Sequence, residues 1–197
     1  MKIIGLTGSV GSGKSTVGAL MEKHFSVKMR MTDNIGHLAM EPGQDSYQKI
    51  VESFGDGILR EDKTIDRNRL SGIVFSDTSK LQVLNGIIHP WVKDYLRKDI
   101  AQEQARGLFS YYVIESAILF QTQLDAVCGE VWYVDAREEV RRERLKKNRG
   151  YSDEKVDSIM RQQRENEQWK LRCDKILENN SDEASILEQL KKYFVVS

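Results

Sequence analysis

Short apolar stretches alternate with longer charged segments along this chain. Five of the stretches are rich in β-branched and aromatic residues and have the length of strands. Strands that alternate with helical segments predict an α/β fold, in which a parallel sheet is wrapped by helices. The five predicted strands are Lys2–Thr7, Val27–Met31, Tyr111–Glu115, Glu130–Val134 and Lys175–Leu177.

Apolar residues at helical spacing fill most of the intervals between these strands. A helix is predicted to begin near Lys14, because apolar residues recur on one face between Val17 and Phe25. The interval 34–110 has no clear strand and predicts a helical insertion. The segment Gly55–Gly57 and the pair His89-Pro90 predict breaks between its helices.

Two more helical segments are predicted towards the end of the chain. The interval 136–174 is dense in Arg, Lys and Glu, and two acidic residues after Ser152 indicate a helix start in its middle. A last helix is predicted from about Asp182. Its expected apolar face consists of Ile186, Leu187, Leu190, Tyr193 and Phe194.

Length and charge limit the size of the fold and the class of partner. A chain of 197 residues suits a single domain, 1–197, that carries an insertion. Its 30 Lys and Arg residues balance 30 Asp and Glu residues, so the formal net charge is zero. Binders of nucleic acid or anionic membranes that rely on their overall field carry an excess of basic residues. We therefore expect no nucleic-acid partner and no membrane partner, and any anion site must be local.

Cysteine usage and the start of the chain point to the cytoplasm. No apolar run approaches the roughly 18 residues needed to cross a bilayer, and the opening MKIIGLTG predicts no secretory signal. Cys128 and Cys173 are the two cysteines, and their spacing fits no zinc site. They are predicted to be small, half-buried thiols rather than redox or metal groups.

A phosphate-binding loop follows the first predicted strand. The run Gly8-Ser9-Val10-Gly11-Ser12-Gly13-Lys14-Ser15 matches GxxxxGK[ST] in full and precedes a predicted helix. Glycines let successive backbone N–H groups point at one centre, and the helix N-terminus adds positive potential. A plain glycine-rich turn would not explain a Lys-Ser pair directly after the last glycine. The motif therefore predicts a P-loop that binds a nucleoside triphosphate.

Individual residues of this loop have predicted roles. Lys14 is expected to contact the β- and γ-phosphates during catalysis, and the Ser15 hydroxyl is expected to bind Mg²⁺. The predicted phosphate-binding residues are Gly8, Gly11, Ser12, Gly13, Lys14, Ser15 and Thr16.

The P-loop alone does not name the reaction. The guanine-reading motif Asn-Lys-x-Asp is absent from the sequence, which disfavours a GTPase. Motor and helicase ATPases are usually larger. A small chain with a helical insertion and an Arg-rich segment better matches a small-molecule kinase, in which 34–110 covers the substrate and 136–174 forms a lid.

Beyond the P-loop, the chain resembles the dephospho-coenzyme A kinase family nearly from end to end. The family's opening L-T-G-G-I-G-S-G-K-S appears as Leu6–Ser15, and its D-A-D-x-I as Thr32–Ile35. Its L-N-x-I-x-H-P is matched in full by Leu84–Pro90, and its A-D-x-V-I-x-N resembles 173–179. An ordered set of this kind is far more specific than a P-loop.

The resemblance implies a P-loop NTPase three-layer fold and a defined reaction. ATP, with Mg²⁺, would phosphorylate the 3′-hydroxyl of dephospho-coenzyme A to give coenzyme A and ADP. Among the positions that depart from the family pattern, Gln121 stands where the family has Glu, and Asn148 stands where the lid motif has Arg, with Arg149 one residue further on.

Two carboxylates are candidates for the chemistry. Asp33 follows the second predicted strand and matches the second Asp of the family motif, so it is the predicted catalytic group that accepts or orients the hydroxyl proton. Its alternative role is a helix N-cap. Glu115 ends the apolar third strand and is a candidate for the metal or its water shell, with a structural cap as the alternative.

Arginines of the predicted lid are the remaining candidates for phosphate contact. Arg141 and Arg144 lie three residues apart on one side of a helix, and Arg144 is the predicted catalytic one. Charge runs of this kind also occur as solvated faces. Asn179 is a candidate to frame adenine, although Asn179-Asn180-Ser181 also has the composition of an ordinary turn.

Two other functions remain open from the sequence. One is phosphorylation of another small hydroxylated metabolite, such as a nucleoside, a nucleotide or a sugar acid. The other is that of a regulatory module that binds ATP without catalysis. Asp33 separates the last hypothesis from both kinase hypotheses, because only a kinase needs its carboxylate.

Overall fold

The computed structural model describes residues 1–163 and 167–194, and the chain divides into two compact units. The first unit comprises Met1–Arg30 and Arg106–Ser197, and the second comprises Met31–Ala105. The single domain with an insertion at 34–110 and a lid at 136–174 stays a prediction.

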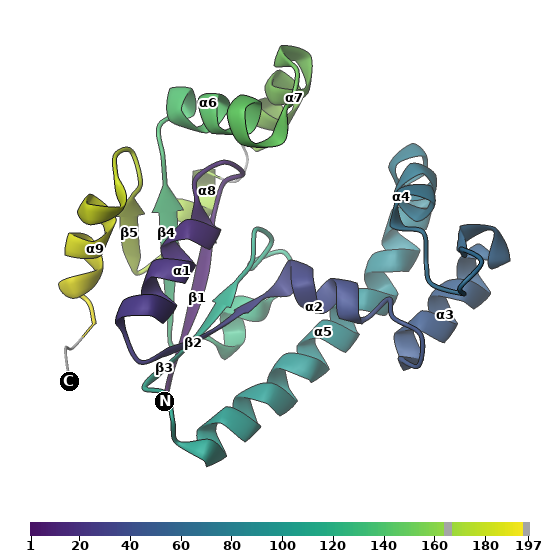
Figure 1. The fold of residues 1–197 in the computed structure, drawn as a ribbon, viewed down its shortest axis with the longest axis horizontal. Coiled ribbons are helices and arrows are strands. Elements are labelled where there is room, and N and C mark those ends of the chain that lie inside the picture. The colour runs from purple at the N-terminus through teal and green to yellow at the C-terminus, as the bar shows by residue number, and fades with distance from the viewer. Residues whose placement is uncertain (164–166, 195–197) are drawn as a thin grey trace. The chain divides into compact units, whose positions relative to one another are not determined.

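A five-stranded sheet forms the centre of the first unit. Its strand order is β2-β3-β1-β4-β5, and β1 pairs in parallel with both β3 and β4 (Figure 1). All five predicted strands are confirmed, and β1, β4 and β5 each extend one residue further than predicted. The bounds are β1 Lys2–Gly8, β2 Val27–Met31, β3 Tyr111–Glu115, β4 Glu130–Asp135 and β5 Lys175–Glu178. The chain therefore leaves β1 at the carboxyl edge between two neighbours, where open α/β sheets bind ligands.

Helices α1 (Lys14–His24) and α9 (Glu183–Lys191) contact one another in this unit. The predicted apolar residues Val17, Leu20 and Met21 of α1 are buried, and α1 contacts β1 and β3. Asp182 caps α9 by accepting a hydrogen bond from the backbone N–H of Ser185, which confirms the predicted start. Apolar burial on α1 thus fixes the helix that follows the phosphate loop against the sheet.

The predicted end of the last helix is wrong. Helix α9 ends at Lys191, so Tyr193 and Phe194 follow it in a turn. Consecutive residues of a helix point about 100° apart, whereas both of these rings lie against Trp132, at centroid distances of 5.5 and 5.1 Å. Phe194 also stacks on Phe25 at 4.4 Å. Aromatic packing on the sheet therefore replaces the last helical turn.

The remaining elements of the first unit follow β3 and β4. They are η2 (Leu124–Val127), α6 (Glu138–Arg149), α7 (Asp153–Gln163) and α8 (Glu167–Lys170). The predicted helix start at Ser152 is confirmed by α7. Within the described residues, none of the helices combines the length and the apolar content that crossing a bilayer requires.

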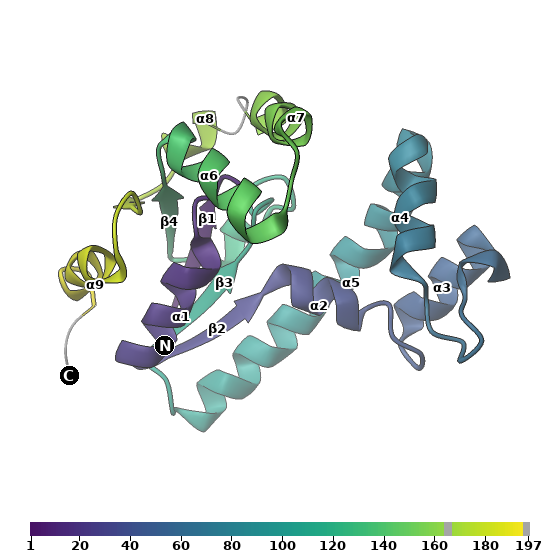
Figure 2. The ribbon, with the colours of Figure 1, turned by 45° about the horizontal axis from the view of Figure 1, so that its top comes forward.

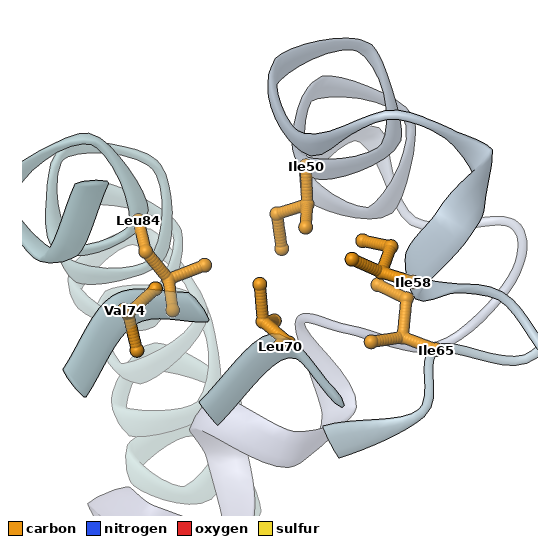
Figure 3. Packing of buried hydrophobic residues seen from close by; sticks show 6 residues of the cluster. All are labelled: Ile50, Ile58, Ile65, Leu70, Val74 and Leu84. Atoms are coloured by element: carbon orange, nitrogen blue, oxygen red, sulfur yellow. The ribbon is translucent and has the colours of Figure 1, made fainter. Parts of the chain in front are cut away.

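The second unit is helical, as predicted, and has its own core. It contains α2 (Thr32–Leu38), α3 (Asp45–Phe54), η1 (Asp56–Ile58), α4 (Arg67–Ser76) and most of α5 (Thr78–Arg106). The predicted break after α3 is confirmed, because Gly55 has a φ of 78°. Figure 3 shows the six core side chains gathered between these elements: Ile50, Ile58, Ile65, Leu70, Val74 and Leu84.

The predicted break at Pro90 is wrong, because α5 runs through it. Proline lacks the N–H that would bond the Gly86 carbonyl, and this costs about 3 kcal/mol in a helix interior. The helix extends more than ten residues on each side of Pro90, and buried Leu84, Val92 and Leu96 pack on both sides. Apolar burial on two long flanks outweighs one missing hydrogen bond.

Replacing Pro90 with alanine tests this balance. Pro90→Ala restores the donor for the Gly86 carbonyl at an exposed position, so we expect the free energy of unfolding to rise by about 1–3 kcal/mol. Chemical denaturation followed by circular dichroism measures the change. An unfolding free energy below that of the wild type would show that the proline stabilises α5.

Candidate active site

The phosphate loop lies between β1 and α1, where the sequence places it. Gly8 and Gly13 have φ values of 148° and 87°, which side-chain-bearing residues rarely adopt. A Cβ on Gly8 would lie 2.4 Å from the carbonyl oxygen of Val134 on the neighbouring β4. The glycines thus serve both the curl of the loop and its close approach to the sheet.

Lys14 lies at the start of α1 and is buried. Its Nζ donates hydrogen bonds to the carbonyls of Gly8, at 2.9 Å, and Ser9, at 3.2 Å. The ammonium group is therefore held across the inside of the loop. Ser15 and Thr16 follow in the first turn of α1 and are exposed.

The loop has the features of an anion site. Helix α1 starts without a side-chain cap and without an acidic residue in its first turn, so its first N–H groups have no such partner. The Ser12 hydroxyl is fully buried, and among the described residues its Oγ makes no hydrogen bond. A buried hydroxyl in this state is rare in proteins, and phosphate oxygens are suitable acceptors for it. The residues present therefore fit the triphosphate of ATP.

Helix α6 lies over the junction of β1 and α1, as Figure 2 shows. The Nε of Arg141 donates to the Val10 carbonyl at 3.1 Å, and the Nη1 of Arg144 donates to the Ser12 carbonyl at 3.3 Å. Arg141 is buried and Arg144 is half-buried. The two arginines share a helix side, as predicted, and that side faces the phosphate loop rather than solvent.

Helices α6 and α7 form one small packed element. Val10 of the phosphate loop packs against its apolar cluster of Leu145, Val156 and Met160. Arg142 of α6 joins the helices by donating to Asp157 of α7 at 2.5 Å, and it also donates to Glu138 of its own helix at 2.8 Å. These hydrogen bonds to Glu138 and Asp157 raise the pKa of Arg142. Glu138 and Asp157 thus pair with Arg142, while Arg141 and Arg144 contact the loop.

Asn179 reaches the same loop from the segment after β5. Its side chain is buried, and Nδ2 donates to the Ser12 carbonyl at 2.7 Å. The Asn179 Oδ1 accepts a hydrogen bond from Arg144 at 3.4 Å. Asn179 does lie between a strand and a helix, but a turn alone does not require a buried amide. Its predicted contact with adenine stays a prediction.

Glu115 lies at the carboxyl end of β3, in register with Leu6 of β1, and is buried. Glu115 and the phosphate loop are therefore at the same edge of the sheet. No group of three or more His, Cys, Asp or Glu residues within residues 1–163 and 167–194 is arranged to hold a metal ion by itself. A hydroxyl from Ser15 and a carboxylate from Glu115 are oxygen donors of the kind Mg²⁺ prefers, with phosphates and water completing its shell.

Asp33 belongs to the second unit and lies inside the first turn of α2. The N-cap alternative is wrong, because α2 begins at Thr32 and its cap position is Met31. The helix starts earlier than Asp33, so its carboxylate is exposed instead of bonding the first turn. The catalytic role of Asp33 stays a prediction.

His37 is coupled electrostatically to both Asp33 and Arg67. Burial and the charge of Arg67 lower the pKa of His37, and the Asp33 carboxylate opposes them. Asp33 and His37 are four residues apart and so share one side of α2. The sequence singles out Asp33 by its motif, but only the fold of the second unit brings Arg67 near His37.

One anchor of the phosphate loop was not predicted. The Ser9 hydroxyl and the Tyr133 hydroxyl of β4 form a buried hydrogen bond at 2.9 Å. The resembled family has Gly at the position of Ser9. That departure was the available signal, but the partner on β4 is visible only in the folded chain.

A cavity of about 390 Å³ lies at the other edge of the sheet. Its lining includes Lys2, Tyr111, Glu130 and Lys175, which begin β1, β3, β4 and β5. These residues mark the amino-terminal ends of the strands, whereas open α/β sheets bind ligands at the carboxyl ends. The cavity is therefore separate from the phosphate loop.

Comparison with known proteins identifies the family. The family model for dephospho-CoA kinase matches residues 2–185. The chain belongs to the dephospho-CoA kinase family. A relative in this family, the dephospho-CoA kinase of Carboxydothermus hydrogenoformans, is 36% identical over 191 residues, which cover 96% of this chain and 91% of the relative.

A second relative and a solved structure are also similar to this chain. Dephospho-CoA kinase CAB5 of Saccharomyces cerevisiae is 34% identical over 97% of this chain and 80% of its own length. A crystal structure of a Thermus thermophilus protein matches with a TM-score of 0.80 and 27% identity, over 98% of this chain and 95% of that one. The predicted family and the predicted α/β P-loop kinase fold are confirmed.

The two cysteines are free and half-buried, as predicted. Burial, with a contribution from Asp125, raises the pKa of Cys128 to about 12. Burial, with a contribution from Asp174, raises the pKa of Cys173 to about 11. Because the thiolate is the reactive form, both thiols are expected to be inert near neutral pH.

Alkylation of the folded protein tests this expectation. At pH 8, we expect iodoacetamide to modify Cys128 on the order of a thousandfold more slowly than a free thiol, and Cys173 about a hundredfold more slowly. As the pH is increased, both rates should rise about tenfold for each pH unit until the respective pKa is reached. Mass spectrometry of timed samples, with the denatured chain as control, measures them. Equal rates in folded and denatured protein would contradict the raised pKa values of the two thiols.

Proposed function

We propose that this protein transfers the γ-phosphoryl group of ATP to the 3′-hydroxyl of dephospho-coenzyme A, giving ADP and coenzyme A. The observation that carries the proposal is the anion-binding geometry of the phosphate loop in a chain of the dephospho-CoA kinase family. The proposed location is the cytoplasm, without a nucleic-acid or membrane partner.

The first unit supplies the proposed ATP site. Backbone N–H groups of residues 11–16 bind the β- and γ-phosphates, and Lys14 moves from the loop carbonyls to the phosphate oxygens. Arg144 offers a planar guanidinium beside the loop for the charge that develops as the bond to ADP breaks. Arg141 supports the same binding site from one helical turn away.

Mg²⁺ fits this proposal through Ser15 and Glu115. When bound, the ion would neutralise negative charge on the phosphates. The Ser15 hydroxyl is its proposed direct ligand, and Glu115 is proposed to hold the ion or its water shell from the end of β3. Both residues belong to the first unit.

Asp33 is the proposed acceptor of the hydroxyl proton. The 3′-oxygen forms a bond to the γ-phosphorus, the bond from that phosphorus to the β,γ-bridging oxygen breaks, and the proton passes to the carboxylate. His37 lies one helical turn from Asp33 in the second unit, and Arg67 lies close enough to His37 to lower its pKa. Arg67 is suited to an anionic substrate such as dephospho-coenzyme A.

Turnover with a panel of acceptors tests the proposed reaction. We expect Mg²⁺-dependent ADP release with dephospho-coenzyme A and little release with shikimate, gluconate, nucleosides or nucleoside monophosphates. Omitting Mg²⁺ should abolish turnover. Faster release with another acceptor would identify a different metabolite kinase, and an absence of ADP release with every acceptor would favour a regulatory ATP-binding module.

The substitution Asp33→Asn tests the proposed proton acceptor. We expect kcat to fall about 10²- to 10⁴-fold, while the affinity for ATP stays within about twofold of the wild type. Asp45→Asn is the matched control, because Asp45 is also an exposed acid in the first turn of a helix in the second unit. Equal activity of the Asp33 and Asp45 variants would contradict the role of Asp33.

A further inference from the structure

The peptide planes of the phosphate loop offer a way to control its geometry. In a trans peptide, the carbonyl of one residue and the N–H of the next point in opposite directions. The described chain has no cis peptide bond. A side chain that holds a loop carbonyl outward therefore turns the following N–H inward, where such loops bind phosphate.

The Ser12 carbonyl is held in this way by two side chains. The Asn179 Nδ2 donates to it at 2.7 Å, and the Arg144 Nη1 donates at 3.3 Å. These side chains also bond to each other, through Arg144 Nη2 and Asn179 Oδ1 at 3.4 Å. The carbonyl, the amide and the guanidinium form a closed set of hydrogen bonds around one peptide plane.

The amide is the better-fixed member of this set. Asn179 is 5% exposed, and its backbone N–H donates to the Asp135 carbonyl at the end of β4, at 2.8 Å. A Cβ on Gly13 would lie 2.2 Å from Asn179 Nδ2, so the loop and the amide fit each other closely. Asn179 therefore fixes the peptide between Ser12 and Gly13 relative to the end of β4.

We propose that Asn179 is a positioning residue for phosphate binding. By holding the Ser12 carbonyl outward, it directs the Gly13 N–H towards the phosphate chain. It strengthens binding of the polyphosphate and does not depend on the base. The inference rests on the proposed function only in taking ATP as the natural ligand. It gives the amide a role different from the predicted contact with adenine.

Binding of two ligands to Asn179→Ala tests this role. Isothermal titration calorimetry would compare MgATP with magnesium tripolyphosphate, which lacks both base and ribose. Loss of a buried hydrogen bond and of the aligned N–H is expected to weaken both ligands about tenfold. In turnover assays, KM for ATP should rise similarly, while KM for dephospho-coenzyme A stays within about twofold.

A neighbouring variant provides the control. The Gln189 side chain bonds the backbone N–H and carbonyl of Glu178, one residue before Asn179, at 2.9 Å each. Gln189→Ala thus loosens the attachment of the same strand end while leaving the Ser12 contact in place. We expect it to lower thermal stability while keeping wild-type affinity for both ligands. Asn179→Asp, which keeps the acceptor for Arg144 and lacks the donor, replaces the alanine variant if that variant does not fold.

The outcomes separate positioning from the alternatives. Weaker binding of ATP with unchanged binding of tripolyphosphate would overturn the inference and assign Asn179 to the base. Unchanged affinity for both ligands in a folded variant would also overturn it, as would a wild-type protein that binds ATP but not tripolyphosphate. A wild-type protein inactive on dephospho-coenzyme A, with tripolyphosphate binding still dependent on Asn179, would refute the proposed function alone.

Discussion

The outward carbonyls of the phosphate loop are the constraint on which the rest of the site depends. A loop that points its N–H groups at one centre must direct its carbonyls elsewhere, and buried carbonyls need donors. Arg141 supplies one for Val10, and Arg144 and Asn179 supply two for Ser12. The carbonyls of Gly8 and Ser9 differ, because they accept hydrogen bonds from Lys14, whose ammonium group lies across the inside of the loop. The residues predicted to contact ATP are thus also the residues that shape its binding loop in this structure.

This arrangement explains how a chain without net charge is suited to a highly charged ligand. Acidic residues balance the basic ones over the whole chain. Within α6, the individual arginines have different partners. Arg142 pairs with Glu138 and Asp157, whereas Arg141 and Arg144 donate hydrogen bonds to carbonyls of the phosphate loop. The apolar cluster with Val10 holds α6 and α7 against that loop. Packing and pairing therefore concentrate positive charge where a triphosphate would bind.

Local patterns predicted the strands, the phosphate loop and the helical content of the interval 34–110 well, because each depends on neighbouring residues. Strand β3 is predicted by its own apolar run, and the loop at residues 8–13 is predicted by its own glycines. Errors arose where distant contacts decide the outcome: buried flanks carry α5 through Pro90, and contacts with Trp132 place Tyr193 and Phe194 beyond α9. The amide of Asn179 and the Ser9–Tyr133 bond join segments more than a hundred residues apart, so no local pattern reveals them.

The proposed phosphoryl transfer is tested most directly by determining where the γ-phosphate of ATP is found in the products. ³¹P nuclear magnetic resonance of a reaction with ATP, Mg²⁺ and dephospho-coenzyme A would follow the γ-phosphorus as it leaves ATP. We expect a new phosphomonoester signal from a phosphate on the 3′-oxygen of the ribose, in equal amount to the ADP formed. Inorganic phosphate in place of that signal, or a phosphoryl group on another hydroxyl, would contradict it.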